Sequence, residues 1–251
     1  MNDRRIALVT GANQGVGRQV AKELVADGQT VFVGSRDLER GEAAAREIGP
    51  GAIAIQLNVT DAASIAAAAE RIRTETGRLD LLVNNAGISN TTKGDMSLVE
   101  YEKVSQASNA SLDEIRAVWE TNVFGVLAVY QAMLPLLRTS SDARIVNVSS
   151  GVGSLTTNAD PANPYHAFFG PIYPASKTAL NAITLAMMVE LESTDIKVNL
   201  VSPGFTSTNL NGYEGAESVE DGSREVVRVA LLGPDDPTGT FTRWENTTIP
   251  W

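Results

Sequence analysis

The chain has 251 residues, no cysteine and a formal net charge of −10, and 43% of its residues are apolar. This length allows one sizeable α/β core or two smaller ones. The acidic charge, spread along the chain, argues against a nucleic-acid partner, and the lack of cysteine excludes disulfides and thiolate metal sites. No run of eighteen apolar residues indicates a membrane span, and the amino terminus lacks the apolar core of a signal peptide. We therefore expect a cytoplasmic protein with no membrane association and no metal site.

Short runs rich in Val, Ile and Leu alternate with amphipathic segments of helical periodicity. The runs are Arg5–Thr10, Thr30–Gly34, Ala52–Leu57, Leu79–Asn84, Arg144–Ser149 and Lys197–Ser202. Runs that are apolar on both faces are typical of strands in a covered parallel sheet. The amphipathic segments are Val16–Gly28, Leu38–Gly49, Asp61–Gly77 and two longer ones, roughly Ser111–Leu137 and Tyr173–Glu192. The alternation predicts one doubly wound α/β domain over residues 1–251.

The first expected strand leads into a glycine-rich turn, Thr10–Arg18, which reads TGANQGVGR. Gly11 permits a tight turn, Gly15 lets the backbone approach a diphosphate, and Gly17 allows the helix to pack closely on the strand. The N–H groups at the start of the next helix favour an anion. The turn predicts a nucleotide site, with a plain tight turn as the alternative. Its predicted lining is Gly11, Asn13, Gln14, Gly15, Val16 and Gly17.

The end of the second expected strand bears on which dinucleotide is bound. A carboxylate at this place holds the ribose 2′-hydroxyl of NAD, but here Ser35 occupies it and Arg36 follows. Arg36 can pair with a 2′-phosphate, to which Ser35 can donate a hydrogen bond. The alternative is that Arg36 faces solvent at the start of a helix. Asp37 is close enough to keep NAD(H) open, so the sequence favours NADP(H) without excluding NAD(H).

Two long polar connections, Gly87–Ala110 and Gly151–Ile172, interrupt the alternation of strands and helices. Connections of this length in a compact domain are usually functional or mobile. Both follow strands, at the end of the sheet where open α/β folds bind ligands. The sole histidine, His166, lies in the second connection, where we expect it at the surface.

Tyr173 precedes Lys177 by one turn of the last long helix, so both side chains lie on one face. Taken alone, the pair could be a surface contact. A cation beside a phenol favours the phenolate and lowers its pKa, which suits a tyrosine that exchanges a proton near neutral pH. The Ser-rich end of the preceding strand, Ser149 and Ser150, adds a hydroxyl that can stabilise a developing oxyanion.

Several motifs occur in one order along the chain and together carry a family resemblance. Beside the glycine-rich turn and Tyr173-xxx-Lys177, they are NNAG at Asn84–Gly87, TNVFG around Asn122, NVSS at Asn147–Ser150 and SPGFTST at Ser202–Thr208. The sequence thus resembles the classical short-chain dehydrogenase/reductase family, and its tail and the longer loop before Tyr173 resemble the carbonyl-reductase subgroup. The resemblance implies a single Rossmann-type domain with seven parallel strands, and hydride transfer between a nicotinamide and a carbonyl or alcohol.

The resemblance also assigns roles to single residues. It implies that the catalytic set is Asn122, Ser150, Tyr173 and Lys177, with Ser150 favoured over Ser149. In this reading Asn122 binds a water that links Lys177 to solvent, although on its own it would be a packed amide. The implied contacts to the cofactor are Asn58, Val59, Asn85, Ala86, Gly87, Tyr173, Lys177, Pro203, Gly204, Thr206 and Thr208. Asn58 departs from the Asp that the family usually has there, so altered contacts to the adenine are expected.

Aromatic residues near these motifs bear on the substrate. Phe168, Phe169, Phe205 and Tyr213 are available to wall the pocket, which suits a small hydrophobic or aromatic ketone or aldehyde. The favoured reading is NADPH-dependent reduction. An NAD(P)-dependent secondary-alcohol dehydrogenase working oxidatively, and an NADP-sensing protein without catalysis, stay open. The two long helices pair between subunits in the family, so a homo-oligomer is favoured, with a monomer as the alternative.

Overall fold

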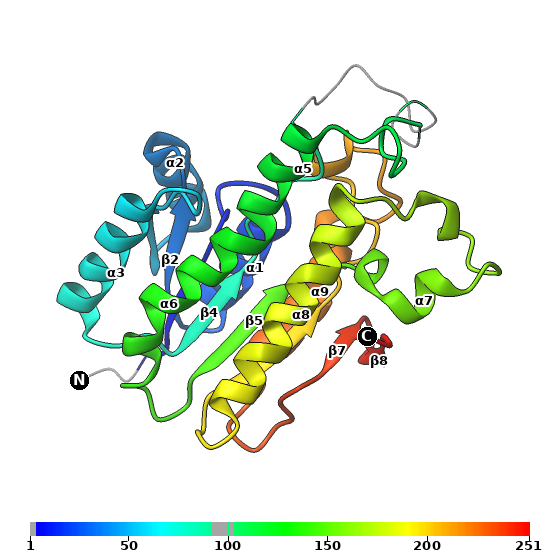
Figure 1. The fold of residues 1–251 in the computed structure, drawn as a ribbon. Helices are drawn as coiled ribbons and strands as arrows, with labels where there is room; N and C mark the ends of the chain where they lie inside the picture. The colour runs from blue at the N-terminus through cyan, green and yellow to red at the C-terminus, as the bar shows by residue number, and fades with distance from the viewer. Residues whose placement is uncertain (1–3, 92–99, 101–102) are drawn as a thin grey trace.

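The computed structural model of the protein describes residues 4–91, 100 and 103–251, and these form an α/β fold around one sheet (Figure 1). The strand order is β3-β2-β1-β4-β5-β6-β7-β8. The strands are β1 (Ile6–Val9), β2 (Thr30–Ser35), β3 (Ala52–Gln56), β4 (Leu81–Asn84), β5 (Arg144–Val148), β6 (Lys197–Val201), β7 (Phe241–Arg243) and β8 (Thr247–Thr248). The order reverses direction between β1 and β4, which confirms the predicted doubly wound Rossmann-type fold.

The expected seven parallel strands are present, but the sheet has one strand more. The strands from β1 to β7 pair in parallel. The chain then turns back after β7, and β8 pairs with it antiparallel, with Thr242 opposite Thr248. Asn246 in this turn has a positive φ of 56°, a conformation that Asn tolerates better than most residues. The expected seven parallel strands are thus confirmed, and β8 is an additional antiparallel strand whose two residues are too few to show an alternating pattern.

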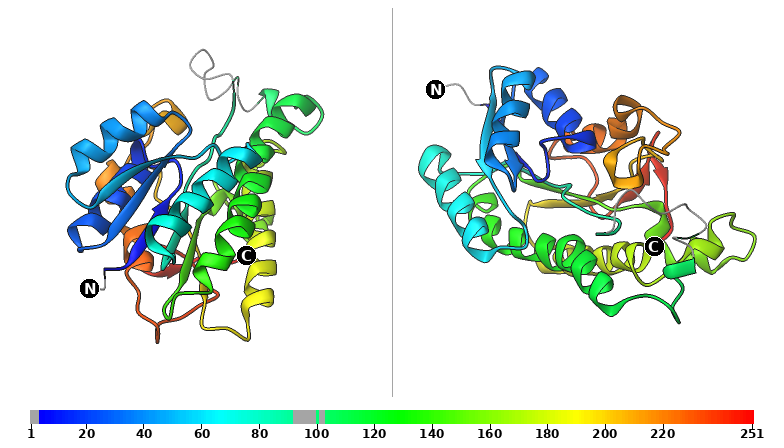
Figure 2. Two further views of the ribbon diagram at one scale, coloured as in Figure 1. Left: turned by 90° about the vertical axis from the view of Figure 1, so that its left-hand side faces the viewer. Right: turned by 90° about the horizontal axis from the view of Figure 1, so that it is seen from above.

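Helices cover both faces of the sheet (Figure 2). Helices α1 (Gly15–Ala26), α2 (Leu38–Ile48) and α9 (Val219–Ala230) lie on one face, and α3 (Ala62–Thr76), α6 (Gly125–Leu137) and α8 (Tyr173–Leu191) lie on the other. Each face has its own hydrophobic cluster, centred on residues such as Val20, Leu24 and Val226 on the first and Leu82, Met133 and Leu180 on the second. Because both faces are covered, the central strands are buried and largely apolar, as their sequences predicted.

The predicted helix over roughly Ser111–Leu137 is continuous but changes its winding midway. It consists of α5 (Leu112–Trp119), a π-helical turn η1 (Glu120–Phe124) and α6. By length and composition, this stretch is the one helix of the described chain that could cross a membrane. More than half of its apolar window is buried within the fold, where α6 contributes to the hydrophobic cluster against the sheet.

The predicted long connection Gly151–Ile172 contains short helical segments. They are the 3₁₀ turn η2 (Gly151–Gly153), α7 (Leu155–Ala159) and the 3₁₀ turn η3 (His166–Phe168). Another 3₁₀ turn, η4 (Asn209–Asn211), follows β6. Part of the other predicted connection, Gly87–Ala110, lies outside the described residues.

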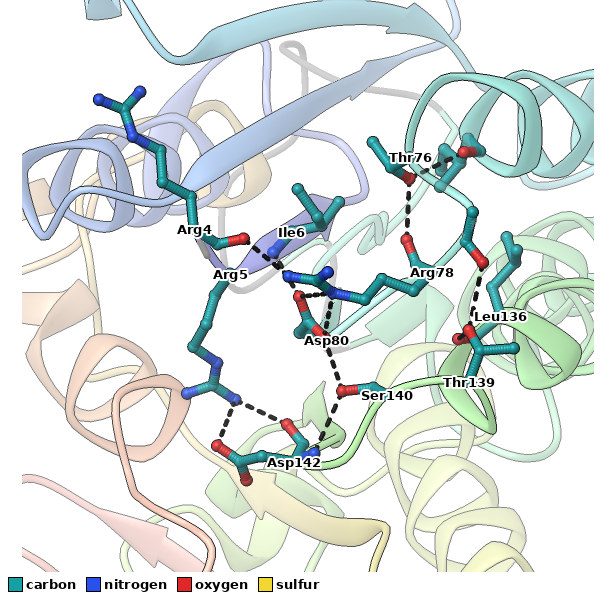
Figure 3. Close-up of polar contacts among 12 residues, drawn as sticks. Arg4, Arg5, Ile6, Thr76, Arg78, Asp80, Leu136, Thr139, Ser140 and Asp142 are labelled. Atoms are coloured by element: carbon teal, nitrogen blue, oxygen red, sulfur yellow. Dashed lines mark hydrogen bonds and ion pairs between the residues drawn. The ribbon is translucent and has the colours of Figure 1, made fainter. Parts of the chain in front are cut away.

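A buried carboxylate joins three strands at their amino ends (Figure 3). Asp80 is 5% exposed, and its oxygens accept hydrogen bonds from Ile6 N at 2.7 Å and Ser140 Oγ at 2.6 Å. Arg78 Nε lies 3.1 Å from both of its oxygens. These bonds hold the starts of β1, β4 and β5 in place. The opposite ends of the same strands carry the predicted site residues.

Candidate active site

The glycine-rich turn after β1 and the Asn-Asn-Ala-Gly turn after β4 are locked together. Thr10 Oγ1 accepts hydrogen bonds from the backbone N–H groups of Asn85 and Ala86, both at 3.0 Å. Asn85 Nδ2 donates in return to Thr10 O at 2.9 Å and Gly11 O at 3.2 Å. The predicted cofactor residue Asn85 therefore uses its amide to fix the shape of the glycine-rich turn.

Two of the predicted glycines are required by close approach of other atoms. A Cβ on Gly17 would lie 2.7 Å from Gly11 O and 2.3 Å from Asn85 Nδ2. Gly11 has a φ of +63°, and a Cβ there would lie 2.9 Å from Ala86 Cα. Any side chain would push α1 away from the strand, so the turn keeps an open backbone surface at the start of α1.

The start of α1 differs from that of the other helices on its face. Gln14 precedes it in an extended conformation and makes no side-chain hydrogen bond to its first turn. By contrast, α2 and α9 begin after Asp37 and Ser218, whose side chains each accept a hydrogen bond from the first turn. The N–H groups that open α1 thus lack a side-chain cap, as an anion site at a helix N-terminus requires. Of the remaining predicted contacts here, Asn13 and Val16 are half-buried.

The three residues at the end of β2, Ser35, Arg36 and Asp37, differ in exposure and in hydrogen bonding. Ser35 is 2% exposed, and its hydroxyl donates to Asp37 O at 2.6 Å. Asp37 Oδ1 accepts from Arg40 N at 3.2 Å and thereby caps α2. Arg36 is exposed and lines a cavity of about 390 Å³ together with Asn58. Of these residues, Arg36 lines the cavity, while Ser35 and Asp37 hold the turn.

Asn58 belongs to a tight turn beneath the π-helical segment. Its Oδ1 accepts hydrogen bonds from Thr60 N at 3.2 Å and Thr60 Oγ1 at 3.0 Å. The next residue, Val59, is buried, and a Cβ on Gly125 would lie 2.8 Å from its carbonyl oxygen. The acceptor side of Asn58 is therefore engaged by its own turn, which leaves the Nδ2 donor for the cavity.

Tyr173 and Lys177 lie in the first turn of α8, as predicted. Lys177 is 5% exposed, its Nζ donates to Val148 O at 3.0 Å, and Nζ lies 5.7 Å from the centre of the Tyr173 ring. Burial lowers the pKa of Lys177 from 10.5 to about 8. Tyr173 itself is half-buried. The structure thus holds an ammonium close to a phenol in a site with little solvent.

The two serines after β5 face different surroundings. Ser149 is 2% exposed, and its hydroxyl donates to Asn181 Oδ1 on α8 at 2.6 Å. Ser150 is half-buried in an extended conformation, and its Oγ accepts a long hydrogen bond of 3.4 Å from Val152 N. Successive side chains of an extended segment point to opposite sides, so Ser150 is turned away from Asn181. Ser150, rather than Ser149, is free to meet a ligand.

Asn122 lies in the π-helical turn and is fully buried. Its Oδ1 accepts from Ile88 N at 2.9 Å, and its Nδ2 donates to Ile88 O at 2.8 Å and Ser176 Oγ at 3.0 Å. The side-chain amide is therefore hydrogen-bonded within the protein, as in the alternative of a packed amide, and the link to a water stays a prediction. π-Helical turns inside α-helices are frequent at functional sites.

The segment after β6 passes over the glycine-rich turn. Thr206 is buried, and its hydroxyl donates to Gly204 O at 3.0 Å. Thr208 caps η4, and its methyl carbon lies 3.5 Å from the position of a Cβ on Gly15. Leu210 O accepts a 2.5 Å hydrogen bond from Ser89 in the segment after β4. The predicted contacts Pro203, Gly204, Thr206 and Thr208 are thus brought to the same end of the sheet as the other motifs.

Three site residues were missed in the sequence. Thr10 anchors the turn after β4, Ser176 bonds to Asn122, and Asn181 bonds to Ser149 and donates from Nδ2 to Gly153 O at 3.2 Å. No local pattern marks Ser176 or Asn181, because their partners on η1 and at the end of β5 lie far from them in the sequence.

Comparisons with known proteins agree with this geometry. The family model described as short chain dehydrogenase matches residues 5–218. The short-chain dehydrogenase anuI of Penicillium roqueforti is 39% identical over 97% of this chain and 96% of its own length, and salutaridine reductase of Papaver somniferum is 31% identical over 95% and 94%. Among solved structures, NADPH-bound carbonyl reductase from chicken fatty liver superposes with a TM-score of 0.80 at 27% identity, covering 99% of each chain.

Proposed function

The chain belongs to the short-chain dehydrogenase family, and we propose that it uses NADPH to reduce a ketone or aldehyde of a small hydrophobic substrate to an alcohol. The observation that carries the proposal is the pairing of Lys177 with Tyr173 at the start of α8. There the buried Lys177 ammonium stands 5.7 Å from the ring of Tyr173, on the helix that also anchors the turns bearing Ser150 and Asn122.

The residues at the carboxyl ends of β1 and β2 fit a phosphorylated dinucleotide. Gly11 and Gly17 form a cradle that a Cβ would fill, and the uncapped start of α1 offers N–H groups to the diphosphate. Arg36 at the cavity would hold a 2′-phosphate, whereas Asp37 is engaged in capping α2 and is poorly available to a ribose hydroxyl. A nicotinamide bound here supplies the hydride for the reaction.

The remaining residues handle the proton and the charge on oxygen. We assign Tyr173 as the group that gives its hydroxyl proton to the substrate oxygen as that oxygen becomes an alkoxide. Lys177 stabilises the resulting phenolate by its positive charge and holds the cofactor ribose. Ser150 donates a hydrogen bond to the substrate oxygen, because its hydroxyl is not tied to α8 as that of Ser149 is. The turn at Asn122 connects Lys177 toward solvent for the return of the proton.

The substrate class is inferred from the exposed rings on the segments after β5 and β6. Phe168 is 43% exposed, Phe205 54% and Tyr213 68%. Exposed aromatic groups on flanking segments suit an apolar substrate that covers them on binding. The reductive direction is supported by a curated relative named salutaridine reductase and a solved neighbour named carbonyl reductase.

The test is the loss of NADPH absorbance with a panel of aryl ketones, diketones and aldehydes, run in parallel with NADH. We expect turnover that favours NADPH, and its loss in Tyr173→Phe by about a thousandfold, within the range for removing a general acid. Tyr173→Phe should bind NADPH as the unaltered protein does, measured by the fluorescence of the bound nicotinamide. Tight NADPH binding without turnover of any carbonyl or alcohol would instead support a sensing protein.

We also propose that the protein forms a homo-oligomer through α5, η1 and α8. These elements pack together and leave Leu112 and Val189 each 65% exposed, Phe124 53% and Leu185 52%. An exposed apolar row of this kind along adjoining helices suits pairing with a second copy. A single 26.6 kDa species across micromolar concentrations in sedimentation would contradict this assignment.

A further inference from the structure

Ser176, between Tyr173 and Lys177, has no part in the function proposed above. Ser176 is 0% exposed. Its hydroxyl donates to the carbonyl oxygen of Tyr173 at 2.7 Å and accepts from Asn122 Nδ2 at 3.0 Å. It therefore joins the residue that we assign as proton donor to the π-helical turn, although the two lie far apart in the sequence.

The donors and acceptors in this network allow a single arrangement. The Tyr173 carbonyl can only accept, so the one proton of Ser176 points to it, and the lone pairs of Ser176 remain for Asn122 Nδ2. Ile88 N can only donate, so Asn122 Oδ1 faces it, and Nδ2 reaches Ile88 O. No member can reverse without leaving a buried group unpaired, which makes the geometry rigid.

The network ends next to the ammonium. The position of a Cβ on Gly87 would be 3.2 Å from Asn122 Oδ1 and 3.6 Å from Lys177 Nζ, so both groups border the same small space. A shift of the Asn122 turn would thus change the surroundings of Lys177 directly.

The backbone holds the start of α8 by a hydrogen bond from Ala175 N to Gly170 O at 3.2 Å. Its first residue is Tyr173, and the preceding Ile172 makes no side-chain cap. Trp119 Nε1 holds the chain before the helix by donating to Pro171 O at 3.1 Å. Two hydroxyls within the helix tie this turn to neighbouring elements. That of Thr178 bonds to Pro174 O and to Gly153 O of η2, and that of Ser176 bonds to Tyr173 O and to Asn122 in η1. Of the two hydroxyls, that of Ser176 bonds to the carbonyl of Tyr173 itself, so it bears most directly on the placement of Tyr173.

We propose that Ser176 is a positioning residue that fixes Tyr173 and the Asn122 turn relative to Lys177. This inference rests on the function proposed above. Without the Ser176 hydroxyl, the first turn of α8 moves, the Lys177 ammonium stabilises the phenolate less well, and the proton leaves Tyr173 at a higher pH. Among the described residues, the groups near the Lys177 ammonium from β5, η1 and the turn after β4 are neutral: Val148 O, Asn122 and Gly87.

The first variant is Ser176→Ala, measured in NADPH-dependent reduction of the best carbonyl in the panel. We expect kcat to fall about tenfold to a hundredfold, as for a small misplacement of a reacting group. The pH at which reduction is half-lost should move upward, because Tyr173 keeps its proton longer. NADPH affinity should change less than twofold. Ultraviolet titration of phenolate, taken as the difference from Tyr173→Phe, should show the same upward shift without any turnover.

The matched control is Thr184→Val on the same helix face. Thr184 is also 0% exposed, donates to Leu180 O at 2.7 Å and accepts from Asn147 Nδ2 at 2.9 Å, so it makes the same kinds of bond two turns away. We expect a comparable loss of thermal stability and an unchanged pH profile. Ser176→Thr, which keeps the hydroxyl, should restore the profile, and Ser176→Cys keeps the volume if the alanine variant does not fold.

The outcomes separate the two proposals. The positioning role would be overturned if folded Ser176→Ala had the wild-type kcat and pH profile, or if Thr184→Val showed the same shift in its pH profile. The proposed function would still stand in that case, provided that the unaltered protein turns over a carbonyl and Tyr173→Phe does not. Failure of the unaltered protein to turn over any carbonyl would remove the proposed function. The phenolate titration would still report whether Ser176 places Tyr173.

Discussion

The two ends of the sheet hold buried charges in opposite ways. At the amino end, the Asp80 carboxylate receives hydrogen bonds from Ile6, Ser140 and the cationic Arg78 (Figure 3). At the carboxyl end, the buried Lys177 ammonium donates to a carbonyl, Val148 O, and burial is the cause of its lowered pKa. The first arrangement stabilises the fold, whereas the second leaves a charge poorly compensated. The comparison indicates that the carboxyl end is organised for a ligand and the amino end for stability.

The largest expected effect comes from removing the poorly compensated charge. Lys177→Met should lower turnover by about a thousandfold or more, because the phenolate loses its cation. It should also raise the free energy of unfolding at pH 7. The shift of the Lys177 pKa to about 8 corresponds to on the order of 3 kcal/mol of unfavourable burial.

The stability gained in Lys177→Met should decrease as the pH rises. Below pH 8 Lys177 is protonated in the folded and the unfolded chain, so the full penalty applies. Between about 8 and 10.5 the folded protein has lost this proton while the unfolded chain keeps it, so the wild-type protein gains stability as pH rises. The advantage of Lys177→Met should shrink over this range in urea unfolding. Lys22→Met, at an exposed position on α1, should show no such trend. A variant less stable than wild type at pH 7 would contradict the comparison.

At the amino end we expect a loss of stability with little change in turnover, the opposite of the result for Lys177→Met. Asp80→Ala should lower the free energy of unfolding by about 3 kcal/mol, because it leaves a partly buried Arg78 and the Ile6 N–H without their partner. Turnover per folded molecule should stay near wild type. The control is Asp113→Ala, which removes an equally direct ion pair to Arg116 at 2.8 Å that is exposed to solvent. It should change stability by about 0.5 kcal/mol or less in the same denaturation experiment. Equal losses in the two variants would argue against the special role of the amino end.

The sequence predicted the framework of both ends better than their detailed contacts. Buried strands are recognisable from uninterrupted Val, Ile and Leu, and the Tyr173–Lys177 spacing and the glycine-rich turn have direct physical signatures. The roles of Ser176 and Asn181 depend on partners 54 and 32 positions away, which no local pattern encodes. The π-helical turn contains no proline or other local signal in its sequence, Glu120–Phe124.

Arg36 tests whether the carboxyl end binds a 2′-phosphate. Arg36→Asp should shift the ratio of NADPH to NADH affinity toward NADH by about thirtyfold, since one charge-assisted contact is worth roughly 2 kcal/mol. Binding is measured by the fluorescence of each bound nicotinamide. Arg46→Asp makes the same charge change at a solvent-exposed position of α2 and should leave the ratio unaltered. An unchanged ratio in Arg36→Asp would place the phosphate contact on another residue.

The smallest loss of turnover is expected for Asn181, which contributes both to stability and to the position of Ser150. Asn181 holds the turn after β5 by accepting from Ser149 Oγ and donating to Gly153 O. Asn181→Leu keeps the branching of the side chain at Cγ but removes its hydrogen bonds, so it should fold with a modest loss of stability while the turn that presents Ser150 loosens. We expect kcat to fall roughly fivefold, as for one hydrogen bond of about 1 kcal/mol, with NADPH affinity unchanged.

Thr178 provides the graded control for this prediction. Its hydroxyl also donates to Gly153 O, at 2.9 Å, but it makes no bond to Ser149. Thr178→Val should therefore reduce kcat less than Asn181→Leu does, since Asn181 still holds both Ser149 and Gly153. If the two variants lost activity equally, the Gly153 carbonyl alone would set the position of Ser150. If neither lost any, the turn would be rigid without α8, and the carboxyl end would depend on this helix for Tyr173 and Lys177 only.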